Sequence, residues 1–132
     1  MMRKKRASKA GDLAARIESI KALFTSLEKE IETLRETGEI AQPGCWIVRY
    51  RARGTGGDYW YYKWQSHDPI FVTKEGKPSC HKYIGKAGSP AFMKAVDMVQ
   101  RRTKIEGLQQ SLYTVELALS DLVEEATREK ES

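Results

Sequence analysis

Residues 45–65 read CWIVRYRARGTGGDYWYYKWQ, and this stretch decides the fold. Along its first nine residues the side chains alternate, with aromatic and aliphatic groups on one face of an extended chain and three arginines on the other. The glycines that follow predict a hairpin turn at 54–58, and the aromatic run 59–65 predicts an antiparallel partner strand. The predicted fold is therefore built around an aromatic, basic β-hairpin.

The predicted sheet continues beyond this hairpin. Residues 70–73 and 80–84 predict a second, smaller hairpin that turns at 75–78, where glycine and proline occur. Residues 45–85 as a whole thus predict an antiparallel sheet of three to four strands. Ser89 and Pro90 then predict the start of a helix, because serine caps helix N-termini and proline is tolerated at the first helical position.

A long helix is predicted on each side of the sheet in the sequence, because apolar residues recur at alternating intervals of four and three. The first helix, residues 10–37, carries Leu13, Ile17, Ile20, Phe24, Leu27, Ile31 and Leu34. The second, residues 89–126, carries Ile105, Leu108, Leu112, Val115, Leu119 and Leu122. Such narrow apolar seams need a partner helix. We therefore predict an α+β fold, with the sheet inserted between two heptad helices that pair as an antiparallel coiled coil, within one chain or across a homodimer.

The second helix has two apolar stripes that differ in phase. Phe92, Val96 and Val99 set the first stripe, and the heptad seam begins at Ile105 after the polar residues 100–104. We expect the first turns to pack on the sheet and the later turns to pack on the first helix. Gly38 is predicted to end the first helix in a left-handed conformation.

The length of 132 residues predicts a single domain, residues 10–132, that follows a disordered basic tail, residues 1–9. No apolar run approaches the roughly 20 residues that cross a bilayer, and no secretory signal is predicted. Two cysteines do not make a disulfide framework of the secreted type. We expect free thiols in a reducing cytoplasm.

Charge is unevenly distributed along the chain. Residues 45–104 contain 12 Lys/Arg against 4 Asp/Glu, a balance of +8, whereas residues 105–132 contain 2 against 7, a balance of −5. The N-terminal tail adds Arg3, Lys4, Lys5 and Arg6. A basic surface of this kind attracts phosphate backbones through counterion release. A purely solubilising surface is the competing interpretation.

The arginine row is the strongest candidate for ligand contact, because guanidinium groups bind phosphates and can read guanine edges bidentately. Lysines of neighbouring strands would extend the patch, and tyrosines would offer stacking surfaces to a single strand. The predicted nucleic-acid-binding residues are Arg49, Arg51, Arg53, Tyr59, Tyr61, Lys63, Lys74, Lys77, Lys82 and Lys86. The competing interpretation is that the arginines only protect the sheet against edge aggregation. Trp46, Trp60 and Trp64 are predicted to be core residues between the sheet and the second helix.

Catalysis is poorly supported by the sequence. The two histidines, His67 and His81, belong to no recognisable nucleophile motif. A zinc site that joins them to Cys45 and Cys80 would lack the usual spacing of paired cysteines. We therefore expect no enzymatic activity, no cofactor and no metal.

Three segments carry a resemblance to known proteins: residues 59–64 (YWYYKW), Gly76-Lys77, and residues 82–86 (KYIGK). Over residues 45–99 the chain resembles the arm-type, AP2-like DNA-binding domain of tyrosine recombinases. The resemblance implies that a three-stranded sheet enters the major groove of DNA and that a helix packs behind the sheet. The chain is also similar to small uncharacterised bacterial coiled-coil proteins of cyanobacterial and mobile-element type, which implies no activity.

These observations favour a small basic protein that binds nucleic acid, DNA rather than RNA, through an arginine-lined sheet on a coiled-coil scaffold. The expected protein is a homodimer through its heptad helices, has no membrane association and is cytoplasmic. The alternative is a protein–protein adaptor or regulatory subunit that uses the aromatic sheet or the coiled-coil face.

Overall fold

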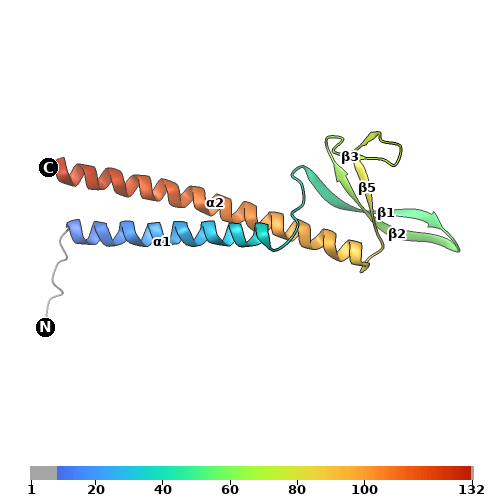
Figure 1. The fold of residues 1–132 in the computed structure, drawn as a ribbon, viewed down its shortest axis with the longest axis horizontal. Helices are drawn as coiled ribbons and strands as arrows, with labels where there is room; N and C mark the ends of the chain where they lie inside the picture. The colour runs from blue at the N-terminus through green and yellow to red at the C-terminus, as the bar shows by residue number, and fades with distance from the viewer. Residues whose placement is uncertain (1–8, 132) are drawn as a thin grey trace. The chain divides into compact units, whose positions relative to one another are not determined.

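The structure is a computed structural model that describes residues 9–131 (Figure 1). The predicted basic tail therefore lies outside the described residues, apart from Lys9. The chain divides into two compact units. Of the described residues, one unit consists of 9–36 and 105–131, and the other consists of Thr37–Lys104.

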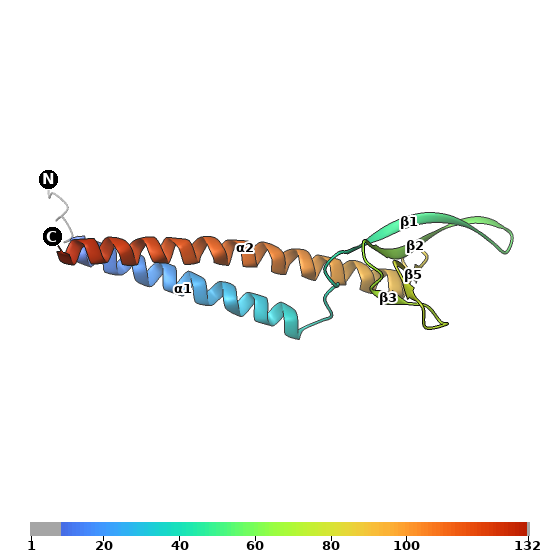
Figure 2. The ribbon, with the colours of Figure 1, turned by 90° about the horizontal axis from the view of Figure 1, so that it is seen from above.

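The first unit contains helix α1 (Lys9–Glu36) and the later part of helix α2 (Pro90–Glu131). The N-terminal end of α1 and the C-terminal end of α2 lie side by side in antiparallel directions (Figures 1 and 2). Arg16 Nη1 lies 3.1 Å from Glu125 Oε2 across this pair. Four seam residues are buried here: Leu13, Ile105, Val115 and Leu122. Most other residues of the two seams are only half-buried.

The second unit is built on a three-stranded antiparallel sheet of order β1-β2-β5. Its strands are β1 (Cys45–Gly54), β2 (Gly57–Ser66) and β5 (His81–Gly85). The β1–β2 ladder runs up to the pair Gly54 and Gly57, so only Thr55 and Gly56 form the loop. The turn is thus shorter than the predicted residues 54–58. Gly56 supports it with φ +84°, a conformation that L side chains rarely adopt.

The predicted second hairpin is wrong in its pairing. Strand β3 (Phe71–Val72) pairs instead with β4 (Pro78–Ser79) in a separate two-stranded sheet. Strand β5 pairs with β2, where Lys63 lies opposite Tyr83. This pairing brings the apolar Ile84 into the core, where it is 8% exposed. Burial of that side chain gives a physical reason for the observed partner.

The core of this unit lies between the sheet and the first turns of α2. Cys45, Trp64, Ile84 and Ala95 are buried together with Ala41. From α2, Phe92, Met98 and Val99 pack against this cluster, so the expected packing of the first helical turns on the sheet is present. The helix begins with the predicted cap, since the Phe92 amide donates to Ser89 Oγ at 3.2 Å.

Only one of the three tryptophans is a core residue. Trp64 is buried, whereas Trp60 is 46% exposed. Trp46 is half-buried and packs on His67, with ring centroids 4.7 Å apart. The prediction that Trp46 and Trp60 fill the core is therefore wrong. Trp46 pairs with Gln65, so its side chain points to the other face of the sheet from that of Trp64. Trp60 lies at the turn end of the hairpin.

Two arginines of α2 fix the segment that leads into the sheet. Arg102 Nη1 donates to the carbonyl oxygens of Gln42 and Cys45, at 2.6 and 2.8 Å. Arg101 contacts Asp97 Oδ2 at 2.9 Å and Thr37 Oγ1 at 2.8 Å.

Gly38 takes part in the same contacts. A Cβ atom on this residue would meet the Arg101 guanidinium. Gly38 is not among the glycines with positive φ, so the predicted left-handed conformation is wrong and the glycine instead permits close approach.

We expect Arg102→Ala to lower the free energy of unfolding by about 1–3 kcal/mol, because it leaves the part-buried Cys45 carbonyl oxygen and the exposed Gln42 carbonyl oxygen without their charged donor. Urea denaturation followed by circular dichroism measures the change. The control is Lys104→Ala, which removes the same charge from an exposed position of the same helix. Equal unfolding midpoints for the two variants would contradict the role given to Arg102.

Candidate nucleic-acid interface

The register of the β1–β2 ladder assigns each candidate residue to a face, because residues directly opposite in an antiparallel pair point the same way. Arg49 lies opposite Tyr62, and Arg51 lies opposite Trp60. Tyr50, on the other face, lies opposite Tyr61. The turn end of the hairpin projects beyond the rest of this unit (Figures 1 and 2).

One face of this projecting end carries the arginine row. We call Arg49, Arg51, Arg53, Asp58 and Trp60 the arginine face. Further along the same face lie Ile47 and Trp64, which belong to the core against α2. Towards the turn this cover ends, and all three arginines are exposed.

Trp60 organises the arginine face. The Cζ atom of Arg49 lies 4.1 Å from the Trp60 ring centroid, and that of Arg51 lies 5.2 Å from it. Cation–π contacts of this kind contribute about 0.5–1 kcal/mol at exposed sites. They hold both guanidinium groups near the ring, and because both residues are exposed, their N–H groups remain able to meet an anion.

The hairpin contains little negative charge to neutralise these arginines. Residues 45–66 include four Lys/Arg and one acidic residue, Asp58. Asp58 Oδ1 lies 4.0 Å from Arg53 Nε, at the limit of an ion pair. An exposed pair of this length is worth little and would yield readily to a phosphate. The arginine face is therefore a net cationic surface.

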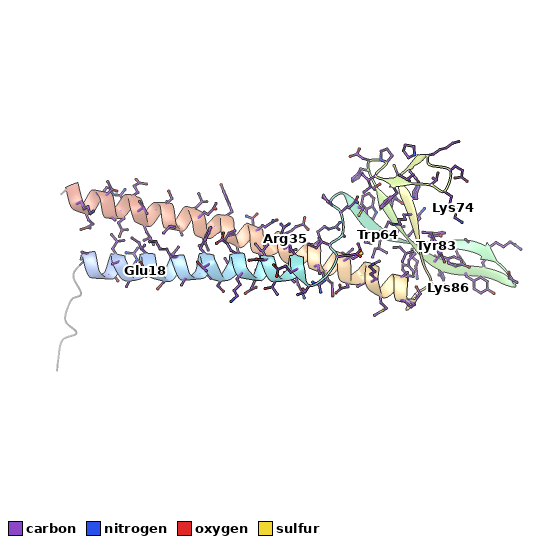
Figure 3. All side chains as sticks on the ribbon, in the orientation of Figure 1. Glu18, Arg35, Trp64, Lys74, Tyr83 and Lys86 are labelled. Atoms are coloured by element: carbon purple, nitrogen blue, oxygen red, sulfur yellow. The ribbon has the colours of Figure 1, made fainter. Side chains whose placement is uncertain are left out.

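The opposite face of the sheet carries a cluster of tyrosines. We call Tyr50, Tyr59, Tyr61, Lys63, Tyr83 and Lys86 the tyrosine face. Ring centroids of Tyr50 and Tyr61 are 6.0 Å apart, and those of Tyr61 and Tyr83 are 6.1 Å apart. Tyr83 is 61% exposed (Figure 3). The tyrosine face thus presents aromatic rings from all three strands of the sheet.

Two lysines accompany these rings. Lys63 Nζ lies 5.0 Å from the Tyr50 ring centroid, and Lys86 Nζ lies 4.7 Å from that of Tyr59. Burial raises the pKa of the Tyr50 phenol, and the neighbouring Tyr83 and Tyr61 raise it further. Because that phenol remains neutral well above neutral pH, it adds no negative charge beside the lysines.

The remaining candidate lysines lie elsewhere in the unit. Lys74, labelled in Figure 3, and Lys77 belong to the turn between β3 and β4. The Thr73 amide donates to the Lys77 carbonyl there at 2.8 Å. Lys82 lies opposite Trp64 and lines a groove of about 330 Å³ together with Ile70, Phe71 and Val72. The structure therefore does not bring the ten candidates into one patch. It divides them between the two faces of the hairpin and these other elements.

Sequence reasoning missed three residues of these surfaces: Trp60 as the partner of the arginines, and Tyr50 and Tyr83 in the tyrosine cluster. The missed signal is the length of the turn. Two-residue loops are common hairpin connections, and the length of the loop fixes which side chains share a face.

The cysteines and histidines do not assemble into a site. Both cysteines are free thiols, and their Sγ atoms contact carbonyl oxygens, of Gln42 at 3.2 Å for Cys45 and of His67 at 3.7 Å for Cys80. Within residues 9–131, no group of three or more His, Cys, Asp or Glu could hold a metal ion. No helix in this described part of the chain has an apolar stretch long enough to cross a bilayer. Comparison of the chain with protein-family models, curated proteins and solved structures gave no match.

The close packing of tyrosines over the turn can be tested at Gly54. A Cβ atom there would lie 2.9 Å from Tyr59 Cδ2 and 3.0 Å from Tyr61 Oη. Tyr59 cannot move freely, since its hydroxyl donates to the Thr55 carbonyl at 2.7 Å. We expect Gly54→Ala to lower the free energy of unfolding by about 1 kcal/mol and to alter the near-ultraviolet circular dichroism of the tyrosines.

The matched control is Gly107→Ala on α2, where an added Cβ meets nothing within 4 Å. This substitution should raise stability by up to about 1 kcal/mol, because alanine favours the helix. Thermal unfolding of the two variants measures both effects. A stabilising Gly54→Ala would show that the tyrosines do not pack on the turn as described.

Proposed function

We propose that this chain is a non-enzymatic nucleic-acid-binding protein whose β1–β2 hairpin contacts phosphates through the arginine face. The observation that carries the proposal is the pair of exposed guanidinium groups, Arg49 and Arg51, that stack on Trp60 in a hairpin with one acidic residue. DNA is the favoured ligand over RNA, as the resemblance to arm-type domains implies.

The stack on Trp60 supports this function physically. A long arginine side chain loses up to about 2 kcal/mol of rotamer freedom when a ligand immobilises it. Contact with the ring already restricts both guanidinium groups, so less of this entropy is lost on binding. A surface that only needed solubility would gain nothing from such ordering.

Replacement of the three arginines by alanine should weaken binding to a fluorescein-labelled DNA duplex at least tenfold. Each lost phosphate contact should also reduce the slope of log affinity against log salt by about one. Fluorescence anisotropy at several salt concentrations measures both quantities. The charge-matched control is Lys21→Ala, Lys29→Ala and Arg35→Ala together, all at exposed positions of α1. Equal loss in the two triple variants would mean that net charge, and not the arginine face, determines binding.

We propose in addition that the heptad helices form a coiled coil that a second copy of the chain completes as a homodimer. Several large apolar side chains outside the two seams are exposed in the first unit: Leu23, Tyr113, Leu117 and Val123. A groove of about 420 Å³ also opens between the helices, lined by residues such as Ala15, Ile20 and Ala118. Helices from a second chain would cover these surfaces.

The dimer is tested by its mass in solution. Light scattering coupled to gel filtration should give twice the chain mass of 15.0 kDa for the wild type. The double variant Leu23→Glu, Leu117→Glu should shift the mass to that of a monomer, since charges at an apolar interface are costly to bury. A monomeric wild type at concentrations of tens of micromolar would exclude the dimer.

A second candidate function is protein–protein docking. The groove beside β3 favours it, because Val72 is 72% exposed and Ile70 is also exposed there. Lys82 at the same groove would suit an acidic partner with an apolar anchor. Absence of any binding to DNA or RNA at low salt would favour this function over the first.

A further inference from the structure

The tyrosine face is an aromatic sheet surface that α2 does not cover. The core that α2 closes contains Cys45, Ile47 and Trp64, all of which point to the opposite side of the β1–β2 ladder. Tyr83 is exposed, and Tyr50 and Tyr61 are half-exposed around it. Aromatic rings left open to water in this number need an explanation beyond the stability of the sheet.

The charge of this face restricts what can cover it. By the register of the two ladders, its strand residues are Trp46, Val48, Tyr50, Ala52, Tyr59, Tyr61, Lys63, Gln65, His81 and Tyr83. None of these is acidic, and the ammonium groups of Lys63 and Lys86 lie beside tyrosine rings. The complementary ligand therefore has flat apolar groups and regularly spaced negative charge.

We propose that the tyrosine face binds unpaired nucleotides, whose bases stack on Tyr61 and Tyr83 while Lys63 and Lys86 contact the flanking phosphates. This inference rests on the proposed function, since the same hairpin carries the arginine face. It adds the ligand class: a single strand, or an unpaired segment, in preference to a continuous duplex.

The distinction from a duplex follows from which parts of the bases are accessible. In a duplex the base faces are stacked on each other, and only their edges reach the grooves. In a single strand the faces are free to stack on aromatic side chains, and a groove or surface of positive charge follows the backbone. Four tyrosines and two adjacent lysines match the second situation.

An acidic peptide is the rival occupant of this face. It would satisfy the lysines through its carboxylates, but it offers no planar group for each ring. Nucleotides supply one base and one phosphate per repeat. The Tyr61 and Tyr83 ring centroids lie 6.1 Å apart, Lys86 Nζ lies 5.8 Å from the Tyr61 centroid, and Lys63 lies opposite Tyr83 in the ladder. The tyrosine face therefore fits a nucleotide strand better than it fits a peptide.

Tyr83 provides the sharpest test, because it is exposed enough to be replaced without loss of the fold. The experiment compares binding of a fluorescein-labelled oligothymidylate with binding of a duplex of the same length by anisotropy. Tyr83→Ala should weaken binding to the single strand about five- to hundredfold, the usual range for loss of one stacked base, and should change duplex binding less than twofold. Tyr83→Phe should bind the single strand as the wild type does, because it keeps the ring.

Met93→Ala is the matched control, since Met93 on α2 is 60% exposed, close to the 61% of Tyr83, and belongs to neither face of the hairpin. It should leave both affinities unchanged. Ultraviolet cross-linking of a bromouracil-substituted strand gives an independent measurement, and the cross-linked peptide should contain Tyr61 or Tyr83.

The outcomes separate this inference from the proposed function. If the wild type binds both ligands and Tyr83→Ala weakens neither, the inference is overturned and the arginine-face proposal stands. If Tyr83→Ala weakens both ligands equally, the face contacts duplex DNA and the preference for unpaired bases is overturned. If the wild type binds neither ligand at low salt, both proposals fail together.

Discussion

The pairing of β1 with β2 is the constraint on which every surface of this hairpin depends. Gly54 pairs with Gly57, and this turn places Arg51 opposite Trp60 and Tyr50 opposite Tyr61. A shift by one residue would move every side chain of one strand to the other face. The separation of an arginine face from a tyrosine face is thus a consequence of a two-residue loop, and Gly56 makes that loop possible with its positive φ.

The core of the sheet unit contains only the end of this hairpin that lies away from the turn. Trp64 and Ile84 pack under the first turns of α2, and Arg102 fixes the entry to β1 through two carbonyl oxygens. Beyond the core, the hairpin depends on its own cross-strand contacts, in which Arg49 and Arg51 stack on Trp60. The same contacts therefore have two roles, since they stabilise the hairpin and also orient the arginines proposed to bind a ligand.

Local sequence was sufficient to predict the two helices from their periodicity, the central hairpin from alternation and glycines, and the cap from the serine at position 89. It was not sufficient for the partner of β5 or for the faces of the hairpin. A turn at residues 54–58 would place Arg49 opposite Lys63 and join arginines, tyrosines and lysines in one patch. The observed register places Arg49 opposite Tyr62 and moves Lys63 to the other side. A difference of one residue, which alternation within a single strand cannot detect, decides the arrangement of the candidate site.

The charge balance of the sequence also overstates how many cations of the sheet unit are available to bind a polyanion. Arg101 and Arg102 contact the segment 37–45, and Lys94 Nζ lies 3.0 Å from Glu39 Oε1. These three cations have structural partners, whereas the arginine face has one weak acidic neighbour in Asp58. Net charge over a segment therefore indicates the sign of a possible ligand but not its place of contact. A better indicator of the contact surface is a group of cations that lie against aromatic rings and have few carboxylates nearby. Both faces of the β1–β2 hairpin meet this condition.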